Sequence, residues 1–389
     1  MTRTDVWHPT CGDAGLPGRR NGRDVKELIS VLRGGVQAGL TPGAVAAISV
    51  RGELRDRVAV GQADRPASVE MTAGTLFDIA SLTKVVATTT ALMALTGRGE
   101  LDPDDRLDRF LRWPEPSITL AHLLTHRAGL LPWQPLYFQA RNAAETLDVI
   151  RRLPPAGPVG SVRSYSDLGV ILLGAVIEQV TGTDLASAVS ALVSAPLGLA
   201  HTGFRPRGTP APGGPVAATS PGDVVEQRMV ATGEPHPVIL AGEHFVDWRH
   251  HLLRGEVADG NAFHALGGVG GHAGLFSTAD DLLAFAHGLL GYSEFPAPRE
   301  VVQRYLRPGP DDQALGWWTK DLPAGIGIWH SGFTGTRLLV QPDSGTAVVL
   351  LTNRLHVLDP EDSTTGGKSP AAPDIAPLWA EVQGAAGLL

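Results

Sequence analysis

The sequence predicts an α+β protein, in which one β-sheet is assembled from both ends of the chain and a mainly helical block is inserted between them. Two observations support this prediction. Strand-like alternation occurs in "GAVAAISVRGELRDRVAVGQA" (43–63) and again in "GIGIWHSGFTGTRLLVQPDSGTAVVLLTNR" (325–354). Between these stretches, helical periodicity dominates. Strands near both ends of a chain with helices between them favour a sheet layer packed against a helical layer.

The first part of the chain is predicted to form a helix, a strand pair and a second helix. Residues 1–22 are irregular and are expected to form a leader segment. A helical pattern then runs from Asp24 to Gly39. Two strands follow it and meet at a turn around Arg51-Gly52. A further helix is predicted from Ser81 to Gly97, with its apolar residues near one stripe.

Helices are predicted through the middle of the chain. Four helical patterns lie at 119–126, 143–152, 167–180 and 184–193. Residues 205–262 are rich in proline and glycine and weakly periodic, so we predict a long loop region or a lid. The next predicted helix covers "STADDLLAFAHGLL", because Ser277 or Thr278 can cap it and two aspartates suit its positive end.

The last third is predicted to hold a strand pair joined at Pro342–Gly345 and a final helix near 375–383. The elements therefore suggest two subdomains. A sheet subdomain combines 23–80 with 266–389, and a mainly helical subdomain covers 81–265.

Composition and charge narrow the class of protein. The net charge is −8 and no run of basic residues occurs, so nucleic-acid binding has little support. Cys11 is the one cysteine, which gives neither an intramolecular disulfide nor a cysteine-based metal cluster. His250, His251 and His264 lack regular ligand spacing, so we expect no metal site. We also expect no cofactor. The N-terminus lacks the apolar core of a signal peptide, and the longest apolar stretch is too short to span a bilayer. We therefore expect a cytoplasmic protein with no membrane partner.

Lysine is rare in this chain, yet one of its four lysines starts a mostly apolar run. In "FDIASLTKVVATTTALMALTGRG", Lys84 follows Ser81 by three residues, and helix positions three apart lie on the same face. An amine at that spacing can accept the proton of a serine nucleophile if burial lowers the amine's pKa. The alternative is that Ser81 caps the helix and Lys84 lies on the surface. The spacing alone leaves both interpretations open.

A second candidate element is "SYSDLGVILLG", in which Tyr165 and Ser166 precede Asp167 at the start of a predicted helix. A tyrosine in this position can relay a proton if a cation stabilises its phenolate. Alternatively, Ser166 or Asp167 simply caps the helix and Tyr165 packs beside it. That alternative explains Asp167 better than it explains Tyr165.

The third candidate element is His330-Ser331-Gly332, which lies between two predicted strands. Backbone N–H groups can point at a substrate oxygen there. The bare pattern His-x-Gly also begins at His201 and His272, so it is weak on its own. Only the copy at 330 borders two strands.

In the order Ser-x-x-Lys, Tyr-x-Asp, His-x-Gly, the chain resembles the serine β-lactamase and penicillin-binding-protein superfamily, in its class C-like and esterase branch. Segments from about 75 to 354 match this superfamily in order, among them "ITLAHLLTHRAGL", "PLGLAHTGF", "GHAGLFSTADDLLAFA" and "LGWW". The resemblance implies a β-lactamase/transpeptidase-like fold with an antiparallel sheet flanked by helices. It also implies that His126 packs structurally, while one ring of Trp317-Trp318 faces the pocket and the other the core.

The resemblance implies that Ser81 is the acylated nucleophile, and that Lys84 and Tyr165 share the general-base and proton-shuttle work. The backbone N–H groups of Ser81 and Phe333 would form the oxyanion hole. The residues expected to contact the substrate are Asp167, His272, His330, Ser331 and Gly332.

Two departures from the superfamily pattern bear on the substrate and on the base. His330 stands where β-lactamases and transpeptidases usually have the lysine of Lys-Thr-Gly, which disfavours β-lactamase or D,D-peptidase activity. Asp167 stands where many members have asparagine, and a carboxylate there would raise the pKa of Lys84. Either Asp167 turns away to cap its helix, or Tyr165 carries more of the base role.

The expected activity is therefore a serine hydrolase that cleaves a small ester, an amide, a peptide or a muropeptide-type substrate. An alternative is an acyltransferase in a biosynthetic pathway, which would use the same residues and a second, acyl-acceptor substrate. A non-catalytic binding module would be expected to lack Ser81, Lys84 or Tyr165, and all three are present.

Overall fold

The computed structural model describes residues 23–240, 245–358 and 372–389, and the expected leader at 1–22 lies outside these residues. Within these ranges, a seven-stranded antiparallel sheet has the order β3-β2-β1-β10-β9-β8-β7. Its strands are β1 Gly43–Val50, β2 Glu53–Asp64, β3 Val69–Glu70, β7 Trp318–Leu322, β8 Gly325–Gly332, β9 Thr336–Gln341 and β10 Thr346–Thr352. The predicted α+β fold, with a sheet assembled from both ends of the chain, is confirmed.

The two halves of the sheet meet where β1 pairs with β10, with Ala44 opposite Thr352 and Val50 opposite Thr346. Both strands are almost continuously buried, because helices cover both faces of the sheet. Helices α1 (Arg23–Gln37) and α10 (Ala376–Ala385) pack on one face, and α8 (Ala279–Leu290) packs on the other. Strand β8, which belongs to the same sheet, is therefore supported by a core on both faces of that sheet.

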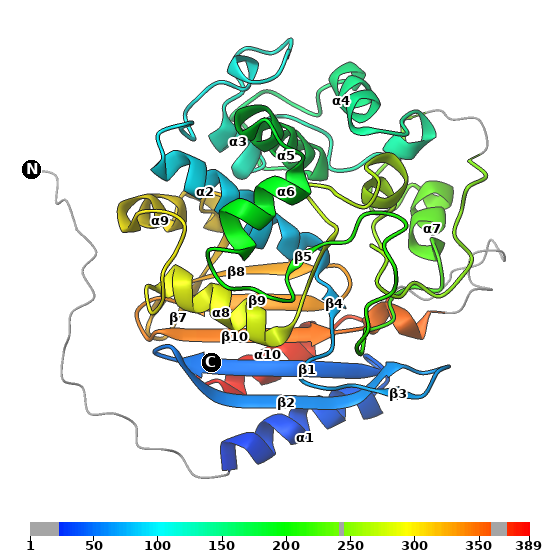
Figure 1. Cartoon of the computed structure of the whole chain (residues 1–389), viewed down its shortest axis with the longest axis vertical. Helices are drawn as coiled ribbons and strands as arrows, with labels where there is room; N and C mark the ends of the chain where they lie inside the picture. Colours follow the sequence, from blue (N-terminus) through cyan, green and yellow to red (C-terminus); the bar gives the residue numbers. More distant parts are fainter. Residues whose placement is uncertain (1–22, 241–244, 359–371) are drawn as a thin grey trace, which may run out of the picture.

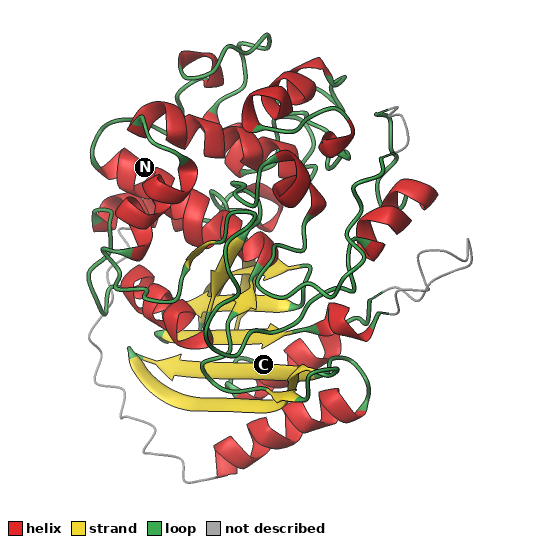
Figure 2. Cartoon of the chain, turned by 45° about the vertical axis from the view of Figure 1, so that its right-hand side comes forward, coloured by secondary structure: helices red, strands yellow, loops and turns green. Residues whose placement is uncertain are grey.

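The helical layer lies above the sheet in Figure 1, and Figure 2 shows the same separation of helices from strands. Its central helix α5 is buried along most of its length. The predicted middle helices are confirmed as α3 Leu120–Leu124, α4 Ala143–Arg152, α5 Asp167–Thr181 and α6 Leu185–Val189, the last continued by a π-helical turn at Ser190–Ser194. Helix α9 (Arg299–Leu306), which packs on α2 (Thr90–Gly97), was not anticipated.

A small second sheet, in the order β4-β6-β5, links the two layers. It joins β4 (Phe77–Asp78) with β6 (Leu275–Ser277) and β5 (Gly203–Phe204). Helix α8 begins directly after β6, and the Thr278 side chain caps it by accepting a hydrogen bond from Asp281 N at 3.3 Å. Of the two predicted caps, the threonine is used.

The 205–262 region contains a helix that the loop prediction missed. Helix α7 (Val224–Thr232) is flanked by buried polar residues rather than by an apolar stripe. Its buried side chains include the carboxylate of Glu226, so hydrophobic periodicity could not reveal it.

In the part of the chain that the structure describes, no single helix has the length and hydrophobicity to span a membrane. The bent pair Asp167–Thr181 and Leu185–Ser194 passes that test only when its two members are taken together, across a bend of 79°.

Candidate active site

Ser81 lies in a tight turn between a strand and a helix. A 3₁₀ turn at Ala80–Leu82 follows β4, a π-helical segment covers Lys84–Thr89, and α2 continues from Thr90. The predicted regular helix from Ser81 is therefore wrong for its first turns. Threonine hydroxyls hold the wider π-helical turns, since Thr89 Oγ1 donates to Lys84 O at 2.7 Å and Thr90 Oγ1 donates to Val85 O at 2.8 Å.

The residue before Ser81 has a strained backbone. Ala80 has φ +47°, in the left-handed region, which costs an alanine about 1 kcal/mol. Asp78 holds this conformation, because its Oδ1 accepts from Ala80 N at 2.9 Å while its Oδ2 accepts from Ala258 N at 2.7 Å. Burial raises the pKa of Asp78 to about 6, although both backbone hydrogen bonds lower it. Asp78 thus ties the turn that carries Ser81 to the distant segment around Ala258.

Lys84 is buried and makes three polar contacts around the nucleophile. Its Nζ donates to Ser81 Oγ at 2.7 Å and to the His272 carbonyl at 3.2 Å, and it pairs with Asp167 Oδ1 at 2.7 Å. Burial alone would lower the pKa of Lys84, but the Asp167 carboxylate and the Tyr165 hydroxyl outweigh it, so the pKa is raised. The resting site therefore holds an ammonium that donates to the serine.

Tyr165 completes the group. Its hydroxyl is hydrogen-bonded to both Lys84 and Ser81, and Lys84 Nζ lies 5.0 Å from its ring centroid. Its ring centroid lies 4.6 Å from that of His126 and 5.7 Å from that of Trp318. Burial raises the pKa of Tyr165, and the hydrogen bonds and charge of Lys84 partly offset this effect. Ser81, Lys84 and Tyr165 are thus brought together, while their chemical roles stay a prediction.

The two alternatives for Asp167 are separated by the structure. Ser166 is the cap of α5, because its Oγ accepts from Gly169 N at 3.3 Å. The Asp167 side chain instead pairs with Lys84. Of the two alternatives, the one in which Asp167 turns away to cap its helix is therefore wrong, and its carboxylate pairs with the Lys84 ammonium.

Replacing Asp167 by asparagine is expected to move the rising limb of the kcat/KM–pH profile to lower pH. The carboxylate raises the pKa of Lys84 and also contributes to the raised pKa of Tyr165, so its removal lowers both. One of these two groups then loses its proton at a lower pH and can act as the base. A profile with an unshifted limb would show that neither group is the base that limits the rate; D321N, which removes an exposed carboxylate on β7, is the control.

His330 lies behind Tyr165 and does not line the pocket, which corrects its expected role in substrate binding. Its ring is buried, 6.2 Å from that of Tyr165 and 6.2 Å from that of Trp318, and its Nδ1 donates to Ser331 O at 3.0 Å. Burial above all, and then the Lys84 ammonium, hold the pKa of His330 well below its usual range. The ring is therefore neutral near pH 7 and supplies no charge for a substrate carboxylate.

The rest of this motif brings β8 against the nucleophile turn. A side chain at Gly332 would collide with Thr336 Oγ1 and with Ile79 O, so only glycine permits this approach. Thr336 Oγ1 donates to Ile79 O at 2.9 Å and Thr334 Oγ1 donates to Asp78 O at 3.0 Å, which ties the end of β8 to the turn. Ser331 is half-buried and, like His330 and Gly332, does not line the pocket.

Ser81 and Phe333 both line the same pocket, as the expected oxyanion hole requires. Among the described residues, neither backbone N–H donates to a backbone carbonyl in a turn, loop or cap. Both donors are thus placed where a substrate oxygen can use them, although their role stays a prediction.

His272 is fully buried, which corrects the expectation that its side chain contacts substrate. Its Nε2 donates to Asp259 Oδ1 at 3.0 Å, and its carbonyl accepts from Lys84. His272 thus contacts Asp259 through its ring and Lys84 through its carbonyl, without facing the pocket. Among the aromatic residues, Trp317 is fully buried in the core, and Trp318 stacks on Tyr165 rather than on the pocket surface.

The pocket has a volume of about 820 Å³ and opens beside Ser81. Tyr165, Asp167 and Phe333 line it on the nucleophile's side, and the 205–262 region contributes α7 and Asp259. Apolar side chains cover much of the remainder, namely Pro132, Trp133, Val224, Val225, Met229, Leu355 and Leu358. Within the described ranges, no group of three or more His, Cys, Asp or Glu side chains is arranged to hold a metal ion.

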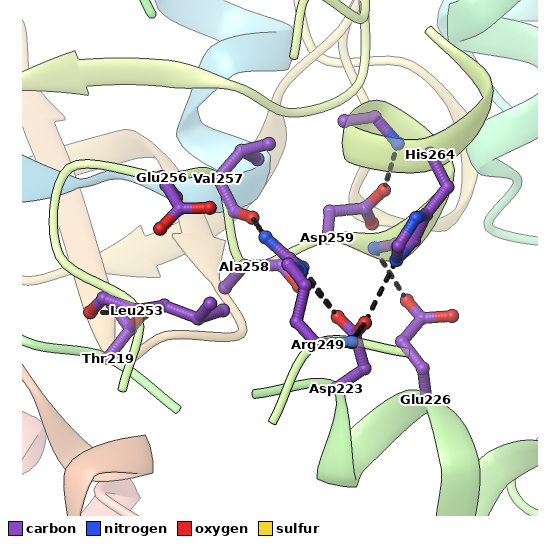
Figure 3. A network of polar contacts seen from close by, with 12 residues as sticks. Thr219, Asp223, Glu226, Arg249, Leu253, Glu256, Val257, Ala258, Asp259 and His264 are labelled. Carbon is purple, nitrogen blue, oxygen red and sulfur yellow. Dashed lines mark hydrogen bonds and ion pairs between the residues drawn. The ribbon is translucent and has the colours of Figure 1, made fainter. Parts of the chain in front are cut away.

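A buried polar network lies beneath this pocket (Figure 3). Arg249 donates to Asp223 Oδ1 from Nε at 2.9 Å and from Nη2 at 2.6 Å, and His264 Nε2 donates to Asp223 Oδ2 at 2.9 Å. Burial alone would raise the pKa of Asp223, but these hydrogen bonds lower it to about 2. Glu226 accepts from the Tyr137 hydroxyl at 2.8 Å and from Gly260 N at 2.9 Å.

This network was missed from sequence, because its members are spread over 137–264 without any regular spacing. Because residues 205–262 are rich in proline and glycine and weakly periodic, they were predicted to form a long loop region or a lid.

A family model described as Beta-lactamase matches residues 28–367. The chain belongs to the beta-lactamase family. It is 31% identical over 330 residues to a "Putative D-alanyl-D-alanine carboxypeptidase" of Escherichia coli (strain K12), covering 75% of this chain and 73% of that protein. It is 28% identical over 392 residues to an "N-acetylmuramyl-L-alanine amidase" of Bacillus subtilis (strain 168), covering 88% and 84%.

Solved structures of beta-lactamase-like enzymes share the fold. "EstCE1, a hydrolase with promiscuous acyltransferase activity" superposes with a TM-score of 0.69 at 22% identity, covering 93% of this chain and 98% of that one. "A class C beta-lactamase" gives a TM-score of 0.67 at 18% identity, covering 93% and 96%. The predicted β-lactamase/transpeptidase-like fold is confirmed, and this family member is a serine hydrolase.

Proposed function

We propose that this beta-lactamase-family protein forms an acyl-enzyme on Ser81 and then hydrolyses it, cleaving an ester or an amide of small-ester, peptide or muropeptide type. The observation that carries the proposal is the 2.7 Å hydrogen bond from Lys84 Nζ to Ser81 Oγ, inside a pocket that Tyr165 and Phe333 also line. A serine in contact with an amine and a phenol is an activated nucleophile.

In the first step, Ser81 Oγ attacks the substrate carbonyl while its proton passes to the Lys84–Tyr165 pair. Both groups are protonated at rest, so one must lose its proton before it acts as the base. The Lys84 ammonium stabilises a Tyr165 phenolate, which favours Tyr165 as the base. The developing oxyanion would accept hydrogen bonds from the N–H groups of Ser81 and Phe333. The pair then returns the proton to the leaving alcohol or amine.

In the second step, water attacks the acyl carbon while the same pair removes the proton of the water. The bond to Ser81 Oγ then breaks, the acid leaves, and the pair returns the proton to Ser81 Oγ. Amide-type substrates are supported by the names of the relatives, one a carboxypeptidase and one an amidase. The neutral ring of His330 supports a substrate other than a β-lactam, since no charge there holds a carboxylate.

A fluorophosphonate probe is expected to add one adduct to the wild-type protein and none to Ser81→Ala, as measured by intact mass. The probe reacts only with an activated serine, and Ser81 is hydrogen-bonded to Lys84. Ser164→Ala is the matched control, because it removes another serine hydroxyl near Tyr165 that does not line the pocket. Absence of an adduct on the wild type, or an adduct that persists in Ser81→Ala, would contradict the proposal.

Product analysis separates hydrolysis from acyl transfer. An ester substrate is incubated with and without added amines and alcohols, and the products are identified by mass. Free acid as the main product supports hydrolysis, whereas acylated acceptor as the main product favours the transferase.

A further inference from the structure

We propose that the pocket recognises a positively charged ammonium group of its substrate through the pocket-facing carboxylate oxygen of Asp259. This inference rests on the proposed function, and it narrows the substrate class to esters or amides that carry a free amine. Asp259 comes from the 205–262 region, which is separate in sequence from all three motifs that identify the nucleophile.

The first support is the geometry of the Asp259 carboxylate. The residue is 8% exposed and lines the same pocket as Ser81. Its Oδ1 accepts from His272 Nε2 at 3.0 Å and from Ala262 N at 2.7 Å. Among the described residues, no hydrogen bond to its Oδ2 is found, and Figure 3 shows a dashed contact from the Asp259 carboxylate to a nitrogen. Oδ1 thus holds the carboxylate in place through two hydrogen bonds, and Oδ2 can accept a hydrogen bond from a ligand.

The second support is the charge around this oxygen. The neighbouring cations are engaged elsewhere, since Arg249 is bonded to Asp223 and Lys84 is paired with Asp167. Glu226 adds a further carboxylate to the pocket lining. Burial first, and then the charge of Asp259, raise the pKa of Glu226 to about 8. A cation placed at Asp259 would therefore offset this effect and lower the pKa of Glu226.

The surroundings favour an ammonium over other cations. Within the described ranges no cluster of ligands is arranged for a metal ion. Of the two arginines that line the pocket, neither donates to Asp259, and Arg354 is bonded to the carbonyls of Phe333 and Pro373 at 2.8 and 2.9 Å. The apolar lining suits the carbon chain between the ammonium and the scissile carbonyl.

The variant Asp259→Asn changes this oxygen with little other disturbance. An asparagine can keep Oδ1 as the acceptor for His272 and Ala262, so only the pocket-facing atom loses its charge. Asp321→Asn is the matched control, because it makes the same substitution at an exposed position on β7.

The test compares benzyl esters of alanine, 4-aminobutyrate and 6-aminohexanoate with their N-acetylated forms, by release of benzyl alcohol. For at least one spacer, kcat/KM is expected to be about 10- to 100-fold higher for the free amine than for its N-acetyl form. This ratio falls to about 1 in Asp259→Asn and is unchanged in Asp321→Asn. Equal rates for free and acetylated esters at every spacer, or a ratio that Asp259→Asn leaves unchanged, would overturn the ammonium site.

A second readout does not depend on ester turnover. n-Butylammonium is expected to slow fluorophosphonate labelling of Ser81 in the wild type, whereas n-butanol at the same concentration is not. If Asp259→Asn does not fold, Glu226→Gln takes its place at about pH 9, where Glu226 is ionised in the wild type, and weaker protection is expected there. Labelling without any selective protection contradicts the ammonium site alone. Absence of labelling and of all ester turnover contradicts the proposed function, and the ammonium site with it.

Discussion

Replacing Lys84 by methionine is expected to lower kcat/KM for any accepted ester or amide by about 100- to 10,000-fold. Methionine is similar in length and tolerates burial, but it cannot carry or pass a proton. In the wild type, Lys84 Nζ donates to Ser81 Oγ at 2.7 Å and hydrogen-bonds the Tyr165 hydroxyl. The variant therefore keeps the nucleophile and loses the charge that stabilises a Tyr165 phenolate. Both kcat/KM and the rate of fluorophosphonate labelling measure the effect.

The loss must be separated from misfolding, because the substitution leaves the Asp167 carboxylate without its ion-pair partner. The double variant K84M/D167N removes that charge as well. It is expected to unfold at a higher temperature than K84M while remaining as inactive. Recovery of activity in the double variant, or wild-type kinetics in K84M, would show that Lys84 takes no part in the chemistry.

Replacing Arg249 by methionine is expected to lower the free energy of unfolding by about 3–5 kcal/mol. The side chains of Arg249 and Asp223 are only 5% and 0% exposed, so the variant leaves a buried carboxylate without its arginine partner. Arg249 Nη1 also donates to Val257 O at 2.7 Å, in the segment whose Ala258 N holds Asp78 beside the nucleophile. Denaturant unfolding followed by fluorescence measures the loss, and kcat/KM is expected to fall with it.

The double variant R249M/D223N supplies the control for this prediction. Its neutral amide removes the unpaired charge, so it should recover a large part of the lost stability. Stability equal to that of R249M in the double variant would contradict the charge argument. The cause would then be the lost hydrogen bonds to Val257 and Ala258.

The sequence was sufficient to predict helices and strands in which the pattern of apolar residues matches the residues that are buried. Helix α4 alternates exposed and buried faces and is capped by Asn142, and its predicted range, 143–152, agrees with the structure. Strands β1 and β10 are apolar runs bounded by turns, and they were predicted for the same reason. Ser81, Lys84 and Tyr165 could be chosen because the order of their motifs resembles that of the superfamily, whereas the Ser-x-x-Lys spacing alone left a helix cap equally open.

The features that were missed or predicted wrongly depend on contacts between residues that are not evident from local sequence patterns. Serine and aspartate are both common helix caps, so the sequence could not show whether Ser166 or Asp167 caps α5. In the structure Ser166 is the cap, which leaves the Asp167 side chain free to pair with Lys84. The burial of His272 and His330 depends on what packs over them. Helix α7 escaped prediction because its inward face carries Glu226, whose partner Tyr137 lies 89 residues earlier.

The join between β1 and β10 has a consequence for how the protein is made. Ala44 finds its partner Thr352 only after almost the whole chain has left the ribosome. Until then β1, β2 and β3 form an incomplete sheet with an open apolar edge, and contacts so distant in sequence form slowly. A nascent chain that stops before β10 exposes β1 as an edge for aggregation. We therefore expect full-length synthesis, rather than any single local segment, to be the step that releases an active enzyme.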